Sequence, residues 1–478
     1  MLISRGPFHG DCLSFARAVE KTIETGRLHY LHSHGFPFTA ILGTGLHYFL
    51  NVFGFNDPVM TVNLFSVIFS SISVVFLFIL TRRIINTPAA FFTAVLFSLS
   101  PVFLGNSLYG NTHMPAMALF LGALLCLTQF TETSKSIWIY AAGLLWGLAF
   151  AARAQDIAIV SPAFLICLWR PHWLTPGKTP GKSFYRHKMA ALGLGTAAIL
   201  FLYWPILQSR FLNQPPKAAQ GFLQSELFHC LIFDWPSNAI YTMETFLLPN
   251  FAWLGIFLIA GGSVFVWKMS WRLALILSIW IMAPLLFFSM LSILTPRLFM
   301  ILLPPCYLLS GICLMRLFQT DKLRWPAAVL FLLTALFPLW QVLPDFAARH
   351  QSDSLAEYAR WVKTQTEPDA VIISTDYKQF LAYYGSRDVT GRMTQRFDQQ
   401  QWRDFLNRIS QLLAEDRPVY ITNVGLYSYD FNFSKRFKNH FRLEYRGYKP
   451  LDDYHTGVLR QTTYLNDLYR VRLKKSSD

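Results

Sequence analysis

An aspartate, two arginines and a group of histidines are the residues of this chain whose types and positions could support group-transfer chemistry. Asp11 lies in Gly10-Asp-Cys-Leu13, at the head of an amphipathic stretch. A carboxylate in such a place can take the proton of an attacking hydroxyl group as a general base. An aspartate near a helix start is also a common N-cap, and both interpretations of Asp11 stay open.

The two arginines each stand at the mouth of an apolar stretch. Arg153 directly follows Gly147-Leu-Ala-Phe-Ala-Ala152, and Arg297 lies in Thr295-Pro-Arg297. Guanidinium groups bind phosphate through two parallel hydrogen bonds and stay charged. The pair therefore predicts a phosphate clamp, with arginines that extend to lipid headgroups as the alternative.

The histidines define a further candidate pocket. His32 and His34 lie in Leu31-His-Ser-His-Gly35, and His113 lies in Tyr109-Gly-Asn-Thr-His113, next to Asn111. We place His34, Asn111 and His113 in a donor or acceptor pocket. Three histidines and one acid could hold zinc, but the spacing is too loose to support it. The sequence requires no cofactor.

These residues must be positioned by membrane-spanning helices. Of the 478 residues, 53% are hydrophobic and only 14% are charged, against about 25% charged in soluble domains. Ten apolar stretches approach the length of about 20 residues that a spanning helix needs. They occupy residues 59–80, 88–105, 113–130, 137–152, 154–169, 189–207, 247–267, 272–293, 297–316 and 325–343. An eleventh, 36–55, is broken by Pro37 and three glycines, and we expect a helix at the membrane edge.

The loop charges predict the orientation, because cytoplasmic loops are rich in Lys and Arg. Alternate loops carry 13 cations on one side and 4 on the other. The first set is Arg82, Arg83, Lys135, Arg170, Lys178, Lys182, Arg186, Lys188, Lys268, Arg272, Arg316, Lys322 and Arg324, and the second is Arg153, Arg210, Lys217 and Arg297. Residues 1–58 and everything after Pro344 are therefore expected outside the cytoplasm. The net charge of +15 is then a matter of topology, and nucleic-acid binding has no support.

The N-terminal segment 1–34 is polar and has nothing that would export it. We expect a first transmembrane helix to be encoded upstream of Met1, the alternative being that 36–55 is itself the first span.

The tail has the pattern of a soluble α/β domain. Helical spacing covers 354–365 and 402–414, and strand patterns cover 370–374, 418–422 and 464–473. Alternating helices and strands favour a partly parallel sheet. The predicted fold is thus a polytopic α-helical membrane protein of about ten spans with a C-terminal soluble α/β domain. Its divisions are an outer first loop (1–58), a membrane domain (59–344) and the tail (345–478).

The order of motifs resembles the GT-C membrane glycosyltransferases, in particular the family 39-like group of protein O-mannosyltransferases and lipid A aminoarabinose transferases. The similarity covers about residues 8–345. It rests on Gly10-Asp11, His34-Gly-Phe-Pro37, Thr81-Arg-Arg-Ile-Ile85, Ser100-Pro-Val-Phe103, Asn111-Thr-His-Met-Pro115, Gly143-Leu-Leu-Trp-Gly-Leu-Ala149 before Arg153, and Pro296-Arg-Leu-Phe-Met-Ile-Leu-Leu-Pro304.

The resemblance implies transfer of a hexosyl or pentosyl group from a polyprenyl-phosphate carrier to an extracytoplasmic glycan, lipid or protein. It implies a multi-pass protein of the plasma (inner) membrane whose partners are membrane lipid and the lipid-linked sugar. The family's aspartate of the first outer loop maps onto Asp11, which would be the catalytic base. Arg153 and Arg297 would hold the donor phosphate.

Two positions depart from the family pattern. Cys12 stands where a second acid is common, and His113 stands where the outer loop usually ends in Asp or Glu. Either departure implies an altered acceptor chemistry or an inactive relative. The alternative function is a lipid or glycolipid transporter without transferase activity, although no internal repeat supports it. A non-catalytic membrane protein would leave the acid and the two arginines unexplained.

Overall fold

The structure is a computed structural model, and it describes residues 3–7, 10–31, 36–174, 184–208, 235–290, 296–351, 353–374, 378–391, 399–427, 431–454 and 461–474. The chain divides into two compact units. Of the described residues, the first unit comprises residue 3 and those between 15 and 347, and the second comprises those between 4 and 14 and from 348 onward. The division falls within the N-terminal helix, between Ser14 and Phe15.

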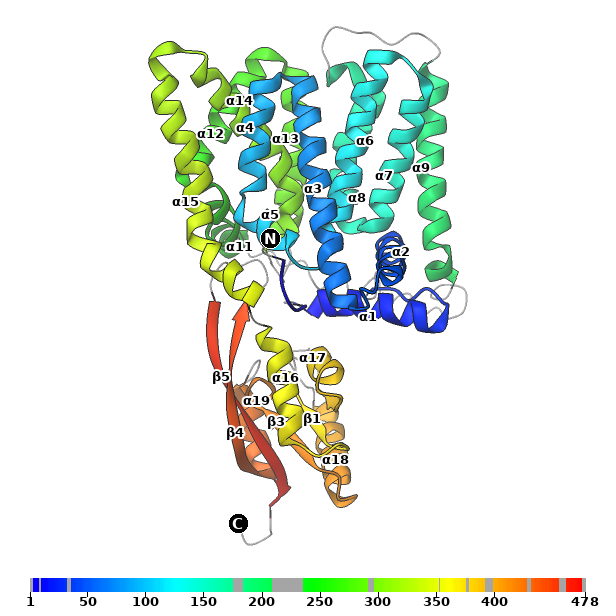
Figure 1. The fold of residues 1–478 in the computed structure, drawn as a ribbon, viewed down its shortest axis with the longest axis vertical. Helices are drawn as coiled ribbons and strands as arrows, with labels where there is room; N and C mark the ends of the chain where they lie inside the picture. Colours follow the sequence, from blue (N-terminus) through cyan, green and yellow to red (C-terminus); the bar gives the residue numbers. More distant parts are fainter. Residues whose placement is uncertain are drawn as a thin grey trace. The chain divides into compact units, whose positions relative to one another are not determined.

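The first unit is a bundle of apolar helices (Figure 1). Its N-terminal half holds α1 (Gly10–Thr25, from Phe15 on), α2 (Pro37–Val52), α3 (Pro58–Ile84), α4 (Thr87–Ser98), α5 (Pro101–Ser107), α6 (His113–Thr133), α7 (Ser136–Ala152), α8 (Ala154–Trp169), η1 (Pro171–Trp173) and α9 (Phe184–Leu207). The C-terminal half holds α11 (Trp235–Thr242), η4 (Met243–Leu247), α12 (Leu248–Met269), α13 (Trp271–Ser289), η5 (Pro296–Leu302), α14 (Leu303–Phe318), η6 (Asp321–Leu323) and α15 (Arg324–Gln351, to Ala347).

Every one of the ten apolar stretches predicted from the sequence contains helix. Within the described residues, seven helices are long and apolar enough to cross a membrane, and the bent pair α4–α5 makes up to eight. The helices α7 and α8 are shorter apolar helices of the same bundle. The prediction of a polytopic α-helical membrane protein is therefore confirmed. The segment 36–55 forms α2, whose 16 residues fall short of the span length.

The stretch 88–105, expected as one span, is bent by 64° between α4 and α5. Ser100-Pro101 interrupts the helix there, and Asn250 of α12 satisfies the break. The Ser100 hydroxyl and the Val102 amide both donate to Asn250 Oδ1, over 2.7 and 3.1 Å. Backbone groups freed at membrane depth need such partners, because lipid offers none.

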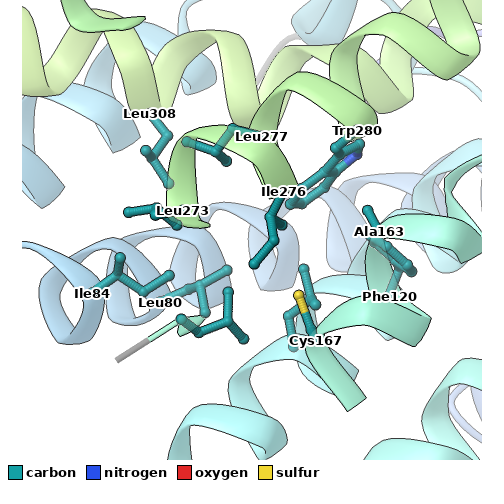
Figure 2. Close-up of a pocket in the computed structure, with 12 residues that line it drawn as sticks. Leu80, Ile84, Phe120, Ala163, Cys167, Leu273, Ile276, Leu277, Trp280 and Leu308 are labelled. Carbon is teal, nitrogen blue, oxygen red and sulfur yellow. The ribbon is translucent and has the colours of Figure 1, made fainter. Parts of the chain in front are cut away.

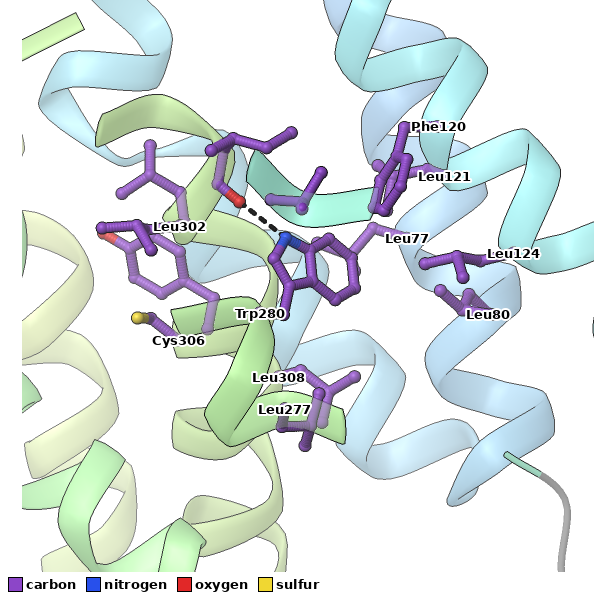
Figure 3. Packing of buried hydrophobic residues seen from close by; sticks show 14 of the residues in the cluster. Leu77, Leu80, Phe120, Leu121, Leu124, Leu277, Trp280, Leu302, Cys306 and Leu308 are labelled. Carbon is purple, nitrogen blue, oxygen red and sulfur yellow. Dashed lines mark hydrogen bonds between the residues drawn. The ribbon is translucent and has the colours of Figure 1, made fainter. Parts of the chain in front are cut away.

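The core lies around α14, which α4, α12 and α13 contact. In the segment Pro296–Phe318, 94% of the most apolar 18-residue stretch is buried inside the protein. Trp280 of α13 donates its indole N–H to the Ile301 carbonyl over 3.0 Å, while its ring packs among leucines and Phe120 (Figure 3). A void of about 10 Å³ between α3, α6, α8, α13 and α14 is lined only by apolar groups and Cys167 (Figure 2). It offers no polar atom for a sugar or phosphate.

Small residues bring α7 and α9 into backbone contact. A Cβ added at Gly143 would overlap the Ala191 carbonyl, and one added at Gly147 would overlap the Gly195 carbonyl. Small residues spaced four apart allow such close helix approach in membranes. This contact fixes the position of the end of α7, where Arg153 follows, against α9.

We therefore expect Gly147→Ala to destabilise the bundle by about 1–3 kcal/mol, the usual cost of overpacking. Unfolding in detergent, followed by tryptophan fluorescence, measures this change. Gly193→Ala on α9 is the matched control, because an added Cβ there meets nothing within 4 Å. Equal stability of the two variants would show that the close contact between α7 and α9 does not exist.

The second unit carries a five-stranded mixed sheet. Its elements are α16 (Ser354–Gln365), β1 (Val371–Ile373), α17 (Lys378–Tyr383), β2 (Asp388–Thr390), α18 (Gln399–Ala414), β3 (Val419–Thr422), α19 (Asn423–Tyr427), α20 (Phe431–His440), β4 (Phe441–Tyr454) and β5 (Gln461–Leu473). The strand order is β2-β1-β3-β5-β4. Strand β1 pairs in parallel with β2 and β3, whereas β5 pairs antiparallel with both β3 and β4. The α/β tail with a partly parallel sheet is confirmed, whereas β2 and β4 were not predicted.

The N-terminal residues 4–14 are built into this second unit. The Arg5 amide donates to the Arg349 carbonyl over 3.2 Å, and the Ser14 hydroxyl donates to Gln379 over 2.7 Å. Asp11 lies between Arg5 and Ser14 in the sequence, and its side chain is half-buried in the first turn of α1.

Candidate functional site

The candidate site is a buried network of polar side chains at the starts of α6 and α8. Asp156, in the first turn of α8, accepts hydrogen bonds on both carboxylate oxygens. The Arg153 Nε donates to Oδ1 over 2.9 Å, and the His113 Nδ1 lies 2.7 Å from Oδ2. The side chains of Asp156 and His113 are 3% and 2% exposed, so solvent hardly screens the pair.

Arg153 occupies the single residue between α7 and α8, with extended backbone angles that end one helix and start the next. Its Nη1 donates to the Thr112 hydroxyl over 2.6 Å, and its guanidinium lies 5.4 Å from the centre of the Phe36 ring. Nε and Nη1 are thus occupied. Nη2 has no hydrogen bond within the described parts of the chain and is left for a ligand.

The loop before α6 positions His113. The backbone amides of Gly110 and Asn111 donate to Asn63 and Ser66 of α3, over 2.8 and 2.9 Å. Asn111 Oδ1 then accepts from the amides of His113 and Met114. The polar face of α3 therefore holds the loop, and Asn111 caps α6.

The imidazole of His113 has one nitrogen left over. With Nδ1 hydrogen-bonded to Asp156, Nε2 is buried and has no partner among the described residues. When Nδ1 donates, Nε2 of the neutral ring is an acceptor, and in the charged ring it is a donor. Arg297, in η5, acts electrostatically on this imidazole. The Tyr203 hydroxyl of α9 lies within the field of Arg153 and is likewise buried without a described partner.

The structure thus brings together three of the predicted site residues, Arg153, His113 and Arg297. Asn111 lies beside them, with both atoms of its side-chain amide engaged by the backbone of its own loop. Asp11 belongs to the second unit, and His34 lies outside the described residues. Arg153 is 9% exposed and paired, so it is not an arginine that extends to the headgroups.

Asp156 and Tyr203 are the additions that the sequence interpretation missed. The signal for Asp156 was present in Arg153-Ala-Gln-Asp156, an acid one helical turn after an arginine at the head of an apolar helix. An acid in that place is rare unless it is paired. Within the described residues, no group of three His, Cys, Asp or Glu side chains could hold a metal ion.

The arrangement can bind an anion. The N-termini of α6 and α8 carry partial positive charge, and Arg153 and Arg297 add full charges. Asp156 neutralises one of these charges and fixes the guanidinium and the imidazole in place. The remaining donors suit a phosphodiester, whose charge grows as it leaves.

Comparison with known proteins places this geometry in context. Residues 45–204 match the family described as dolichyl-phosphate-mannose-protein mannosyltransferase. This segment holds His113, Arg153 and Asp156. No curated protein sequence matches the chain.

Several solved structures share the fold. ArnT from Cupriavidus metallidurans bound to undecaprenyl phosphate has a TM-score of 0.59 and 14% identity, with 96% of this chain and 93% of that chain covered. The oligosaccharyltransferase AglB from Archaeoglobus fulgidus, in complex with an inhibitory peptide and a dolichol-phosphate, gives 0.56 and 13%, with 97% and 71% covered. The arabinofuranosyltransferase AftD from Mycobacteria gives 0.53 and 13%, with 99% and 38% covered. The chain therefore has the fold of the GT-C membrane glycosyltransferases, as the sequence resemblance predicted, and its segment 45–204 has the sequence pattern of the mannosyltransferase family.

Proposed function

We propose that this protein is an integral-membrane glycosyltransferase that moves a sugar from a polyprenyl-phosphate carrier to an acceptor hydroxyl group. The observation that carries the proposal is the buried Arg153–Asp156–His113 network, with Arg297 near enough to act electrostatically on His113. The fold and the family match support the same class of reaction. Two of the solved relatives hold a polyprenyl phosphate, undecaprenyl phosphate in ArnT and dolichol-phosphate in AglB.

The chemistry asks little of the protein beyond binding and proton removal. The acceptor oxygen attacks the sugar's anomeric carbon, the bond from that carbon to the phosphate oxygen breaks, and polyprenyl phosphate leaves. Arg153 Nη2 and Arg297 would bind the phosphate oxygens and stabilise the charge that develops there. His113 Nε2 and the Tyr203 hydroxyl are the next polar atoms available to the sugar.

Asp156 is not the base in this scheme, because both of its oxygens are engaged by Arg153 and His113. It positions the two side chains that meet the donor. The base assigned from the sequence is Asp11, which takes the proton of the acceptor hydroxyl. The departure at His113 then has a role, since an imidazole held by Asp156 stands where the family resemblance implies an acid.

The transporter alternative explains this network less well. A carrier that only moves a lipid needs a site that releases the phosphate on both sides of the membrane. The Arg153 guanidinium is instead held rigidly by Asp156 and Thr112 at the start of α8. Fixed donors are the arrangement expected for stabilising a transition state.

Arg153→Lys should lower both donor binding and turnover. Lysine keeps the positive charge but cannot hydrogen-bond Asp156, Thr112 and a phosphate with one planar group. We expect a loss of about 10²-fold or more in turnover, the scale seen when one transition-state donor is removed. A transfer assay in purified membranes, with a panel of labelled polyprenyl-phosphate sugars, measures the effect.

Arg324→Lys is the matched control for that assay. Arg324 also pairs with an aspartate three residues away, but it is 62% exposed. No sugar transfer by wild-type protein from any carrier in the panel would contradict the proposed function. Wild-type rates in Arg153→Lys would remove the arginine from the site.

We further propose that the C-terminal domain and the acceptor lie outside the cytoplasm, with the protein in the plasma (inner) membrane. The support is the excess of loop cations on the opposite side. An alkaline phosphatase fused after Asp478 should therefore be active, whereas a green fluorescent protein exported there in unfolded form should stay dark. The reverse result would overturn this orientation.

A further inference from the structure

The second unit carries an open groove that none of the preceding chemistry uses. It has a volume of about 570 Å³ and lies where α20 meets the starting end of β4 and the end of β5. Its lining residues are Lys438, Phe441, Arg442, Leu443, Tyr469 and Lys474. Three of the six are cations and none is an acid, and we call this surface the cationic groove.

The strand pairing places like charges opposite each other beside this groove. Arg442 of β4 is the direct partner of Arg472 on β5. Like charges in directly opposed positions of an antiparallel pair are destabilising. Glu444 pairs with only one of these two arginines. Its carboxylate lies 3.4 Å from Arg472 and is shared with Arg446 at 3.8 Å.

Arg442 and Lys474 have no ion pair or side-chain hydrogen bond among the residues that the structure describes. The neighbouring Arg470, by contrast, forms an ion pair with Glu367 at 3.1 Å. Lys438 donates to the Tyr427 hydroxyl over 2.6 Å, which leaves two of its ammonium protons for other acceptors. The groove therefore has three sources of positive charge with most of their donors unused.

Apolar groups form the rest of the groove. Phe441 is buried in the core of the second unit, and Leu443 and Tyr469 are half-buried against the same core. The Tyr469 hydroxyl is already engaged, because it donates to Asp467 over 3.1 Å. A mixed apolar and cationic lining suits a ligand with both a phosphate and a sugar or glycerol portion.

We propose that the cationic groove binds a phosphate-bearing group, presented by a phosphorylated saccharide or by an anionic lipid headgroup. Arginine contributes a planar fork for two phosphate oxygens, and the two lysines contribute single charges. A bound phosphate would also offset the repulsion between Arg442 and Arg472. The proposal does not depend on sugar transfer, because it concerns binding to the second unit alone.

Calorimetry on the full chain tests this proposal. The protein is placed in nanodiscs of phosphatidylcholine and titrated with glucose 1-phosphate, with glucose as the uncharged comparison. A second arm titrates it with phosphatidylcholine vesicles that contain or lack phosphatidylglycerol. Both arms are repeated with Arg153→Lys protein. This repeat distinguishes phosphate binding at the cationic groove from phosphate binding at the buried Arg153–Asp156–His113 network.

We expect glucose 1-phosphate or the anionic vesicles to bind, and Arg442→Gln/Lys474→Gln to weaken that binding about tenfold or more. Arg403→Gln/Arg408→Gln removes the same charge from the exposed face of α18 and should bind like wild type. Loss in the saccharide arm identifies a phosphorylated saccharide as the source, and loss in the vesicle arm identifies a lipid.

Two outcomes would overturn the proposal. One is the absence of binding in both arms. The other is equal weakening by the groove pair and the α18 pair, which would reduce the effect to net charge. A failed transfer assay would leave this result unchanged, and the absence of phosphate binding here would leave the transfer reaction unchanged.

Discussion

Asp156→Ala should destabilise the protein by about 3–5 kcal/mol, because it leaves the buried charge of Arg153 without its counter-ion. The imidazole of His113 would lose its partner in the same step, since one carboxylate serves both side chains. Sugar transfer should fall with it, because the guanidinium loses the contact that orients it. Unfolding in detergent, followed by tryptophan fluorescence, measures the stability change.

Asp321→Ala is a stringent control for burial. Asp321 also pairs with an arginine three residues away, at 2.8 Å, but it is 85% exposed. Exposed pairs of this kind contribute about 0–1 kcal/mol. Asp156→Asn adds a second test, because the amide keeps the shape of the side chain, removes the charge and replaces one of the two acceptor oxygens with a donor. A small and equal loss at positions 156 and 321 would mean that the network does not hold the start of α8.

Asp11→Asn should lower turnover by about 10²–10⁴-fold, the usual range for loss of a general base. Asparagine keeps the shape of the side chain and cannot accept the acceptor's proton. Binding of the carrier lipid should hardly change, because the base meets the acceptor hydroxyl and not the phosphate. Steady-state transfer rates, measured beside carrier binding, separate these two effects.

The helix-capping interpretation of Asp11 predicts the opposite result. Asparagine caps helices about as well as aspartate, so activity and stability would both stay close to wild type. Glu20→Gln, nine residues further along α1, controls for loss of a negative charge on this helix. Wild-type turnover in Asp11→Asn would remove Asp11 from the mechanism and leave the transfer reaction without an assigned base.

Long apolar runs made the membrane domain predictable, because lipid tolerates little else over a span. The break at Ser100-Pro101 was harder to place, since the apolar run continues through it. Its partner, Asn250, is about 150 residues away, and only the folded bundle brings the two together. In the second unit, β1 and β3 are buried on both faces and read as apolar runs. Residues 441–446 of β4 alternate apolar and charged groups, which is the pattern of a half-buried strand, and the sequence interpretation overlooked it. Gly447 and Pro450 interrupt the pattern after that point.

The candidate site was likewise only partly predictable from the sequence. Arg153 was found from the sequence because it interrupts two apolar helices on the side with few cations. Asp156 was missed because it lies inside an apolar stretch, where hydropathy averages conceal one acid. Its pairing with His113, 43 residues earlier, depends on how α6 packs beside α8. Spacing along the chain cannot supply that contact.

The burial of α14 has a consequence for how the protein is made. This helix sits at the centre of the bundle, yet it follows almost all the other apolar helices in the chain. During synthesis, α4, α12 and α13 enter the membrane before the helix they will enclose has left the ribosome. Their inner faces must meet lipid, or an insertion chaperone, until residues 303–318 arrive. A premature stop before Leu303 would thus yield a chain that contains α3 to α13 but lacks the central helix α14. We expect membrane quality control to degrade such a chain.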